Sequence, residues 1–162
     1  MEAARPAVDA DLETIVALAR AAIDELRPTR GGQLWARREA RQEPLGESLG
    51  SALVDPHATV VVGTIDEVVV GYGIVRREGL PEGGALGVVD DLYVEPAARG
   101  VGVGEAMMDE LISWCREHGC EGIDAVALPG NRATKNFFER FGLVARAIVV
   151  HRDLDPTGAS GR

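Results

Sequence analysis

The 162-residue sequence predicts a single α/β (α+β) domain built on a mixed β-sheet, with antiparallel early strands and about four flanking helices. Apolar residues make up 46% of the chain, which is enough for a hydrophobic core at this length. Two β-branched runs, 58–65 and 68–77, are separated by only two residues, which indicates an antiparallel hairpin. A helical pattern separates the apolar strands expected at 85–94 and 123–128, and such a crossover indicates a parallel pair.

The first part of the chain supplies one strand and two helices ahead of the hairpin. A short strand is expected at 5–8. Apolar residues at helical spacing predict a helix over 12–26. A polar, arginine-rich segment at 29–44 then leads to a second short helix at 45–54.

The last part of the chain alternates helices and strands. An amphipathic helix is expected over 102–118 and a shorter one over 131–141. β-Branched residues predict a final strand over 143–154. We therefore expect one domain over residues 1–154 and a disordered tail over 155–162.

The most informative stretch is the glycine-rich turn between the strand at 85–94 and the helix at 102–118. Such a turn presents unpaired backbone N–H groups at the positive end of a helix, where phosphate binds. Glycines let a phosphate approach the backbone closely, and an arginine at the entrance suits a diphosphate. The stretch consists of Arg99, Gly100, Val101, Gly102, Val103 and Gly104. A turn that binds nothing is the alternative.

Two common phosphate-binding patterns do not fit this turn. The P-loop requires Gly-Lys-Ser/Thr, but Glu105 and Ala106 follow Gly104. The dinucleotide-binding fingerprint fails because its third glycine would fall on Glu105 or Met107.

With its flanking segments, the turn resembles the pyrophosphate loop of the GCN5-related N-acetyltransferase (GNAT) superfamily, whose pattern is Arg/Gln-x-x-Gly-x-Gly/Ala. Residues 89–96 look like the fourth strand of that family, and Asn131 and residues 138–143 look like its Asn-containing helix and closing Gly-Phe pair. The resemblance covers residues 60–154. It implies a sheet whose central parallel pair splays apart. It also implies direct transfer of an acetyl group from acetyl-CoA, the co-substrate, to a primary amine in a ternary complex.

The resemblance also assigns residues to acetyl-CoA. In the family, backbone groups of the fourth strand pair with the pantetheine arm and polarise the thioester carbonyl, and the Asn contacts pantetheine. The residues implied here are Leu92, Tyr93, Val94, Arg99, Gly100, Val101, Gly102, Val103, Gly104, Glu105, Asn131 and Phe138. Asn131 is also expected to cap its helix.

Asp90 is the expected catalytic base, because several family members place a carboxylate or His four residues before the position of Val94. Strand alternation predicts Asp90 and Leu92 on one face and Asp91 on the other. An ordinary Asp pKa of about 4 is low for a base at neutral pH, and burial would raise it. A solvated or purely structural aspartate is the alternative.

Phe138 departs from the family, which commonly has a Tyr here that protonates the leaving thiolate. Phe has no proton to give, so the proton would come from water or from a side chain such as Tyr93 or Tyr72, or not at all. The departure keeps open a non-catalytic CoA-binding or regulatory GNAT-like module. A nucleotide-binding α/β protein that uses the turn for another diphosphate is a third class.

Charge and composition restrict the partners. The net charge of −9 argues against nucleic acid. Cys115 and Cys120 have no His cluster nearby, so no metal site is expected. The sequence has no apolar run of about 18 residues and no signal peptide, so a cytoplasmic protein without a membrane partner is expected.

The resemblance implies an acceptor that is an amine of a small molecule or a protein. The arginines of residues 27–41 leave an anionic or carboxylate-bearing acceptor open, while the acidic net charge leaves a polyamine open. The end of the expected final strand, residues 147–152, could pair across a homodimer.

Overall fold

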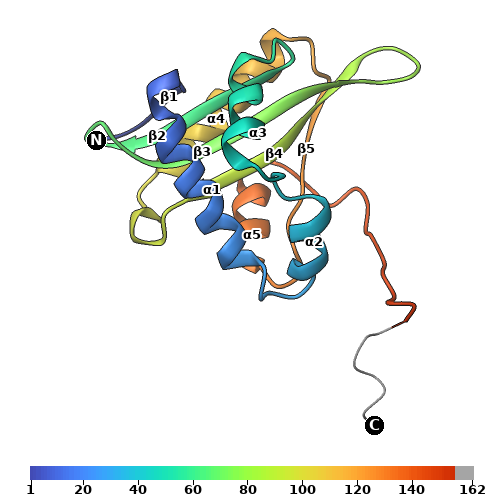
Figure 1. Ribbon diagram of the computed structural model, residues 1–162. Coiled ribbons are helices and arrows are strands. Elements are labelled where there is room, and N and C mark those ends of the chain that lie inside the picture. Colours follow the sequence, from blue (N-terminus) through green and yellow to red (C-terminus); the bar gives the residue numbers. More distant parts are fainter. Residues whose placement is uncertain (156–162) are drawn as a thin grey trace.

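The computed structural model describes residues 1–155, which form a five-stranded sheet covered by helices on both faces (Figure 1). The strands are β1 (Glu2–Pro6), β2 (Ala58–Ile65), β3 (Val68–Gly79), β4 (Ala85–Val94) and β5 (Gly122–Ala125). The α-helices are α1 (Leu12–Leu26), α2 (Gly32–Arg38), α3 (Leu45–Val54), α4 (Val103–Glu117) and α5 (Arg132–Arg140). Short 3-10 turns lie at Asp9–Asp11 and Pro96–Ala98.

The sheet has the order β1-β2-β3-β4-β5 and is mixed, as expected. The first four strands pair antiparallel, and β4 and β5 pair parallel. The expected hairpin joins β2 to β3 through Asp66 and Glu67, both with positive φ, of 46° and 70°. Two successive left-handed residues match the twist of a two-residue hairpin.

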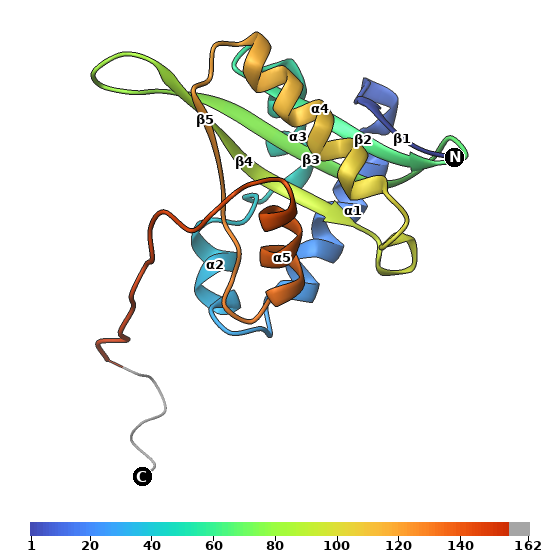
Figure 2. The same ribbon diagram turned by 180° about the vertical axis from the view of Figure 1, so that it is seen from behind.

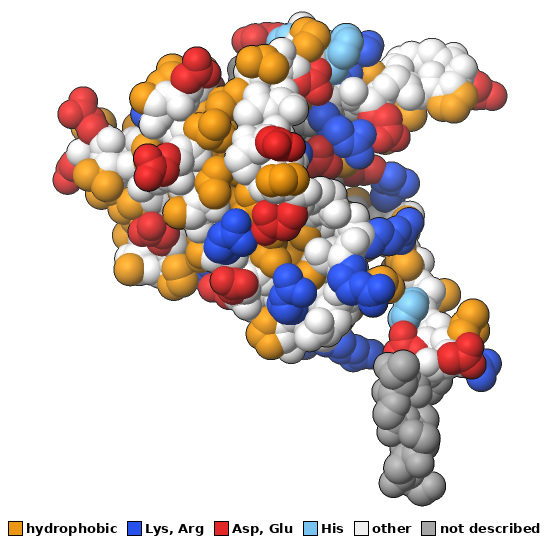
Figure 3. Space-filling model, in the orientation of Figure 1, with side chains coloured by type: hydrophobic (Ala, Val, Ile, Leu, Met, Phe, Trp, Pro, Cys, Tyr) orange, Lys and Arg blue, Asp and Glu red, His pale blue; other side chains and the backbone are white. Residues whose placement is uncertain are grey.

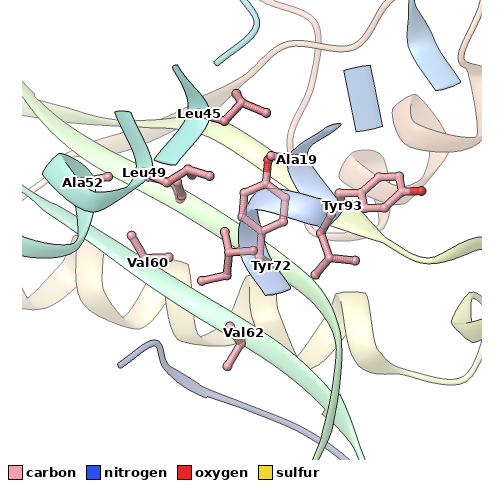
Figure 4. Close-up of a cluster of buried hydrophobic side chains, with 11 residues drawn as sticks. Ala19, Leu45, Leu49, Ala52, Val60, Val62, Tyr72 and Tyr93 are labelled. Atoms are coloured by element: carbon pink, nitrogen blue, oxygen red, sulfur yellow. The ribbon is translucent and has the colours of Figure 1, made fainter. Parts of the chain in front are cut away.

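Each face of the sheet carries its own hydrophobic core. Helices α1 and α3 cover one face and α4 covers the other (Figure 2). Side chains of β2 alternate between the two cores: Val60 and Val62 pack under α1 and α3 (Figure 4), whereas Val61 packs against α4. The sheet is therefore buried on both sides along its centre.

Two glycines allow α4 to lie close to the sheet. A Cβ atom at Gly63 would lie 2.5 Å from Cγ1 of Val103, and one at Gly71 would lie 3.1 Å from Cε of Met107 and 2.7 Å from the carbonyl oxygen of Tyr93. Both positions therefore require glycine. The close approach places the first turns of α4 directly against β2 and β3.

The prediction of a final strand over 143–154 is wrong. Within the described part of the chain these residues form no helix or strand, and they extend away from the sheet after α5 (Figures 1 and 2). Ile148, Val149 and Val150 are 85–89% exposed. A strand needs a hydrogen-bonded neighbour, and β-branched composition does not supply one. Of the expected tail, residues 156–162 lie outside the described residues.

Smaller differences concern boundaries. The first strand begins at Glu2, and helix α2 forms inside the segment expected to be only polar. Strand β5 ends at Ala125 and is half-buried, although a buried strand reaching residue 128 was expected. Residues 126–128 instead turn away from β4, and this separation creates the site described next.

Candidate active site

A cleft of about 680 Å³ opens where β4 and β5 separate. The parallel pairing runs only from Leu86 and Gly122 to Val89 and Ala125. Beyond it, β4 continues along one wall, and residues 126–128 with α5 form the other. The predicted splayed parallel pair is therefore present, and it supplies the cavity.

Backbone groups of β4 face this opening. The amide of Glu95 donates to the carbonyl of Val70 at 2.9 Å, which sets the alternation of the antiparallel ladder. In this alternation the backbone N–H and carbonyl groups of Tyr93 bond to β3. The backbone groups of Leu92 and Val94 therefore point the other way, toward the side of β5. Of the three backbone positions implied by the family resemblance, Leu92 and Val94 face the cleft and Tyr93 does not.

The glycine-rich turn has the backbone that its sequence suggests. Gly100 and Gly102 have φ of +82° and +103°, and α4 begins directly after them. These values belong to the left-handed region, which other residues adopt only with strain. A Cβ at either glycine would meet no atom within 4 Å, so the space before the helix N-terminus is open.

The cation of the turn, Arg99, lies at the cleft but is engaged by the protein. Its guanidinium donates to the carbonyl of Val94 and to Glu25 of α1, both at 2.8 Å, and lies 5.3 Å from the ring centre of Tyr93. Glu105 pairs with Arg140 of α5 at 3.4 Å. The side chain of Val103 is buried in the core.

Asp90 occupies a β-bulge. Asp91 pairs with Ile74 and Val89 pairs with Val75, so Asp90 is the extra residue of β4. A bulge breaks the alternation of side chains. Asp91 bonds to Tyr72 and Asp90 to Arg76, and these two β3 side chains lie on the face covered by α1 and α3. Both aspartates therefore turn to that face, which corrects the prediction that they lie on opposite faces.

The environment of Asp90 suits a base. Its side chain is 28% exposed, and its Oδ2 lies 3.0 Å from Nε of Arg76. Burial raises the pKa of this carboxyl above its usual value, and the charge of Arg76 opposes the rise.

Asp91 is held more tightly than Asp90. Its side chain is 6% exposed, accepts a hydrogen bond of 2.8 Å from the hydroxyl of Tyr72, and pairs with the guanidinium of Arg41. Arg41 comes from the loop between α2 and α3. Burial, with Asp91 beside it, raises the pKa of Tyr72 well above its usual value, so Tyr72 keeps its proton. The sequence did not predict this cluster of Arg41, Tyr72 and Asp91. Its only signal in the sequence was the pair of adjacent aspartates.

The remaining predicted residues lie along the far wall. Asn131 caps α5 as expected: its Oδ1 accepts from the amide of Thr134 at 3.3 Å. Phe138 is 7% exposed and packs in the α4 core while lining the cleft. The Tyr93 side chain also lines the cleft, and burial raises its pKa.

No group of three or more His, Cys, Asp or Glu side chains in residues 1–155 could hold a metal ion. Within the same part of the chain, no helix is long and apolar enough to cross a membrane.

A mixed sheet that opens between two parallel strands, with a glycine turn and helix N-terminus at the opening, defines the acetyltransferase class of α/β folds. The family comparison agrees. Residues 15–143 match the model of the Acetyltransferase (GNAT) family, and the chain belongs to this family. The family assignment indicates acetyl transfer, and the resemblance inferred from the motifs is confirmed.

Solved structures share this fold at low sequence identity. A transcriptional regulator from Bacillus halodurans is 21% identical, with a TM-score of 0.71, over 95% of this chain and 100% of that one. Ribosomal-protein-alanine N-acetyltransferase from Brucella melitensis biovar Abortus is 18% identical, with a TM-score of 0.70, over 96% and 100%.

AAC(6')-Iy, solved with the bisubstrate analog CoA-S-monomethyl-acetylneamine, is 16% identical, with a TM-score of 0.73, over 96% of this chain and 99% of that one. At these identities the likeness concerns the fold. A comparison with curated protein sequences finds no match.

Proposed function

We propose that the protein is an N-acetyltransferase that moves an acetyl group from acetyl-CoA directly to a primary amine in a ternary complex. The observation that carries the proposal is the open end of β4. There, cleft-facing peptide groups, a glycine turn and a half-buried carboxylate line one cavity. Membership of the GNAT family supports acetyl transfer, and a CoA-containing bisubstrate analog bound to a neighbour of the same fold supports the donor.

In the proposed complex, two parts of acetyl-CoA contact different parts of the cleft. The pyrophosphate lies at the N-terminus of α4, where the N–H groups after Gly102 and the guanidinium of Arg99 supply donors. The pantetheine arm lies along β4 and bonds to the peptide groups of Leu92 and Val94. Asn131 and Phe138 line the opposite wall of the same cleft.

Asp90 starts the reaction by accepting a proton from the acceptor ammonium. The freed amine nitrogen attacks the thioester carbonyl carbon, and a new C–N bond forms. Peptide N–H groups of β4 stabilise the oxyanion. The C–S bond then breaks, the nitrogen gives up its second proton to water as the amide forms, and the departing CoA thiolate takes up a proton. The net product is one proton released to solvent, by way of Asp90. A thioester is already activated, so holding the two reactants together requires no covalent enzyme intermediate.

The proton for the thiolate comes from water or from Tyr93. Phe138 has no proton to donate. The hydroxyl of Tyr72 is already engaged by Asp91. Tyr93 lines the cleft and, because burial raises its pKa, keeps its proton at neutral pH.

The test is a panel of primary amines incubated with acetyl-CoA, with thiol release measured together with the mass of the product. The proposal expects one N-acetyl product for each thiol released, over many turnovers. Binding of acetyl-CoA without product from any amine would instead support the non-catalytic CoA-binding module.

A further inference from the structure

All ten charged side chains that line the cleft pair with one another. Two pairs flank the glycine turn, at the end where the donor phosphates are proposed to lie. Two others lie around Asp90, and the fifth joins neighbouring exposed residues at the end of α2. The five pairs are Arg99–Glu25, Arg140–Glu105, Arg38–Glu39, Arg41–Asp91 and Arg76–Asp90.

The immediate surroundings of Asp90 hold one carboxylate more than guanidiniums. Besides Asp90, Arg76 also pairs with Glu78 at 2.7 Å, so one guanidinium serves two carboxylates. Two guanidiniums therefore meet three carboxylates around Asp90: Arg41 and Arg76 face Asp90, Asp91 and Glu78, of which Glu78 does not itself line the cleft.

The other arginines of residues 27–41 do not change this balance. Arg27, Arg30 and Arg37 are exposed and do not line the cleft. Basic side chains gather on the outer surface around α2 (Figure 3). From this segment Arg38 and Arg41 do line the cleft, and both are already paired with carboxylates.

We propose that the acceptor is a primary amine with no carboxylate beside its nitrogen; this inference rests on the proposed function. An acceptor ammonium meets a net negative charge, which favours binding. A carboxylate on the neighbouring carbon would lose its hydration without gaining a free guanidinium, and a charge left in that state is costly. Trp35, Ile23 and Leu26 also line the cleft and offer apolar surface to the rest of the molecule.

The experiment compares amines that differ only by the carboxylate. Tyramine is set against tyrosine, and agmatine against arginine, with N-acetyl product measured at a fixed acetyl-CoA concentration. We expect kcat/KM for the amine to exceed that for the amino acid at least tenfold. Tyrosine amide, which keeps the substituent but not the charge, should behave like tyramine.

One variant tests the charge argument itself. Glu78→Gln releases Arg76 from its second carboxylate, and we expect the tyramine-to-tyrosine ratio to fall several-fold. Glu82→Gln is the control, because it removes the same charge from the loop after β3. Glu82 takes part in none of the ion pairs of the described residues, so the tyramine-to-tyrosine ratio of this variant should not change.

The outcomes separate this inference from the proposed function. Equal or better acetylation of tyrosine, or a ratio unaffected by Glu78→Gln, would overturn the inference and leave the acetyltransferase intact. Absence of any N-acetyl product, with no binding of acetyl-CoA by calorimetry, would overturn the proposed function and the inference together.

Discussion

Asp90 reaches the cleft because β4 contains one residue more than its partner strand at that point. Its replacement by Asn keeps the size of the side chain and removes the base. We predict that Asp90→Asn lowers kcat by about 100-fold or more, the usual contribution of general base catalysis. The Kd for acetyl-CoA should stay unchanged, because the proposed donor contacts lie elsewhere.

Asp109→Asn provides a matched control. Asp109 is exposed on α4 and does not line the cleft, so the substitution makes the same chemical change away from the site. Steady-state rates and calorimetric titration of acetyl-CoA measure the two quantities. A kcat for Asp90→Asn within a factor of two of the unmodified protein would remove Asp90 from the mechanism.

The pH dependence of the reaction follows from the same carboxylate. Burial raises the pKa of Asp90 and Arg76 opposes that rise. Activity requires the ionised form, so it should be lost as the pH falls through a pKa above the ordinary 3.8. We predict that Arg76→Gln removes the opposing charge and moves the acid limb of kcat/KM to higher pH.

Arg77→Gln is the control for this shift, because the neighbouring guanidinium bonds to the carbonyl of His118 instead. An acid limb that moves to lower pH in Arg76→Gln would contradict the assignment. The stability contribution of Asp90 depends on pH in the opposite sense to activity: because its pKa is raised in the folded state, that contribution falls as the pH rises through that pKa.

At the scale of elements, the ion pair between Arg41 and Asp91 joins the loop after α2 to the bulge of β4. The side chains are 17% and 6% exposed. Loss of one partner leaves a buried charge unpaired, which costs about 3–5 kcal/mol in other proteins. We predict that Arg41→Ala lowers the free energy of unfolding in urea by about 3 kcal/mol.

A second arginine gives the comparison. Arg20 pairs with Glu43 at 2.9 Å, but these side chains are 55% and 61% exposed. Exposed pairs contribute about 0–1 kcal/mol, so Arg20→Ala should cost no more than that. Equal losses for the two variants would show that the Arg41–Asp91 pair does not hold the bulge in place.

Local chemistry explains which parts of the site could be predicted. The left-handed glycines of the turn and the cap made by Asn131 depend on a few consecutive residues, and the sequence contains them. The bulge could not be found in this way, because it depends on the register between β3 and β4. Arg41 and Asp91 are 50 residues apart, so only the folded sheet brings them together.

In the part of the chain that the structure describes, two neighbouring features at one side of the molecule are left without a partner: the outer edge of β5 and the apolar segment that follows α5. Among residues 1–155, β5 pairs only with β4. In the segment after α5, Nε of Arg146 donates to Oδ1 of Asp124 on β5 at 2.8 Å. The residues after Arg146 extend away from the sheet. Exposed edges commonly pair with strands of another chain. We predict that residues 147–152 pair with a second copy and form a homodimer.

Light scattering after gel filtration measures this association. The double variant Ile148→Asp and Val150→Asp should be monomeric, whereas Val54→Asp, which changes an exposed residue at the end of α3, should remain dimeric. A monomer for the unmodified chain at tens of micromolar would mean that the segment does not join two copies.

The central claim is that the opening between β4 and β5 binds acetyl-CoA, and a thermal-shift titration with acetyl-CoA, CoA, NAD and ATP tests it most directly. A ligand that binds only the folded protein raises Tm by mass action. We predict that acetyl-CoA and CoA raise Tm in a concentration-dependent manner and that NAD and ATP do not. A rise with NAD or ATP, or no response to either CoA compound, would contradict the account of the cleft.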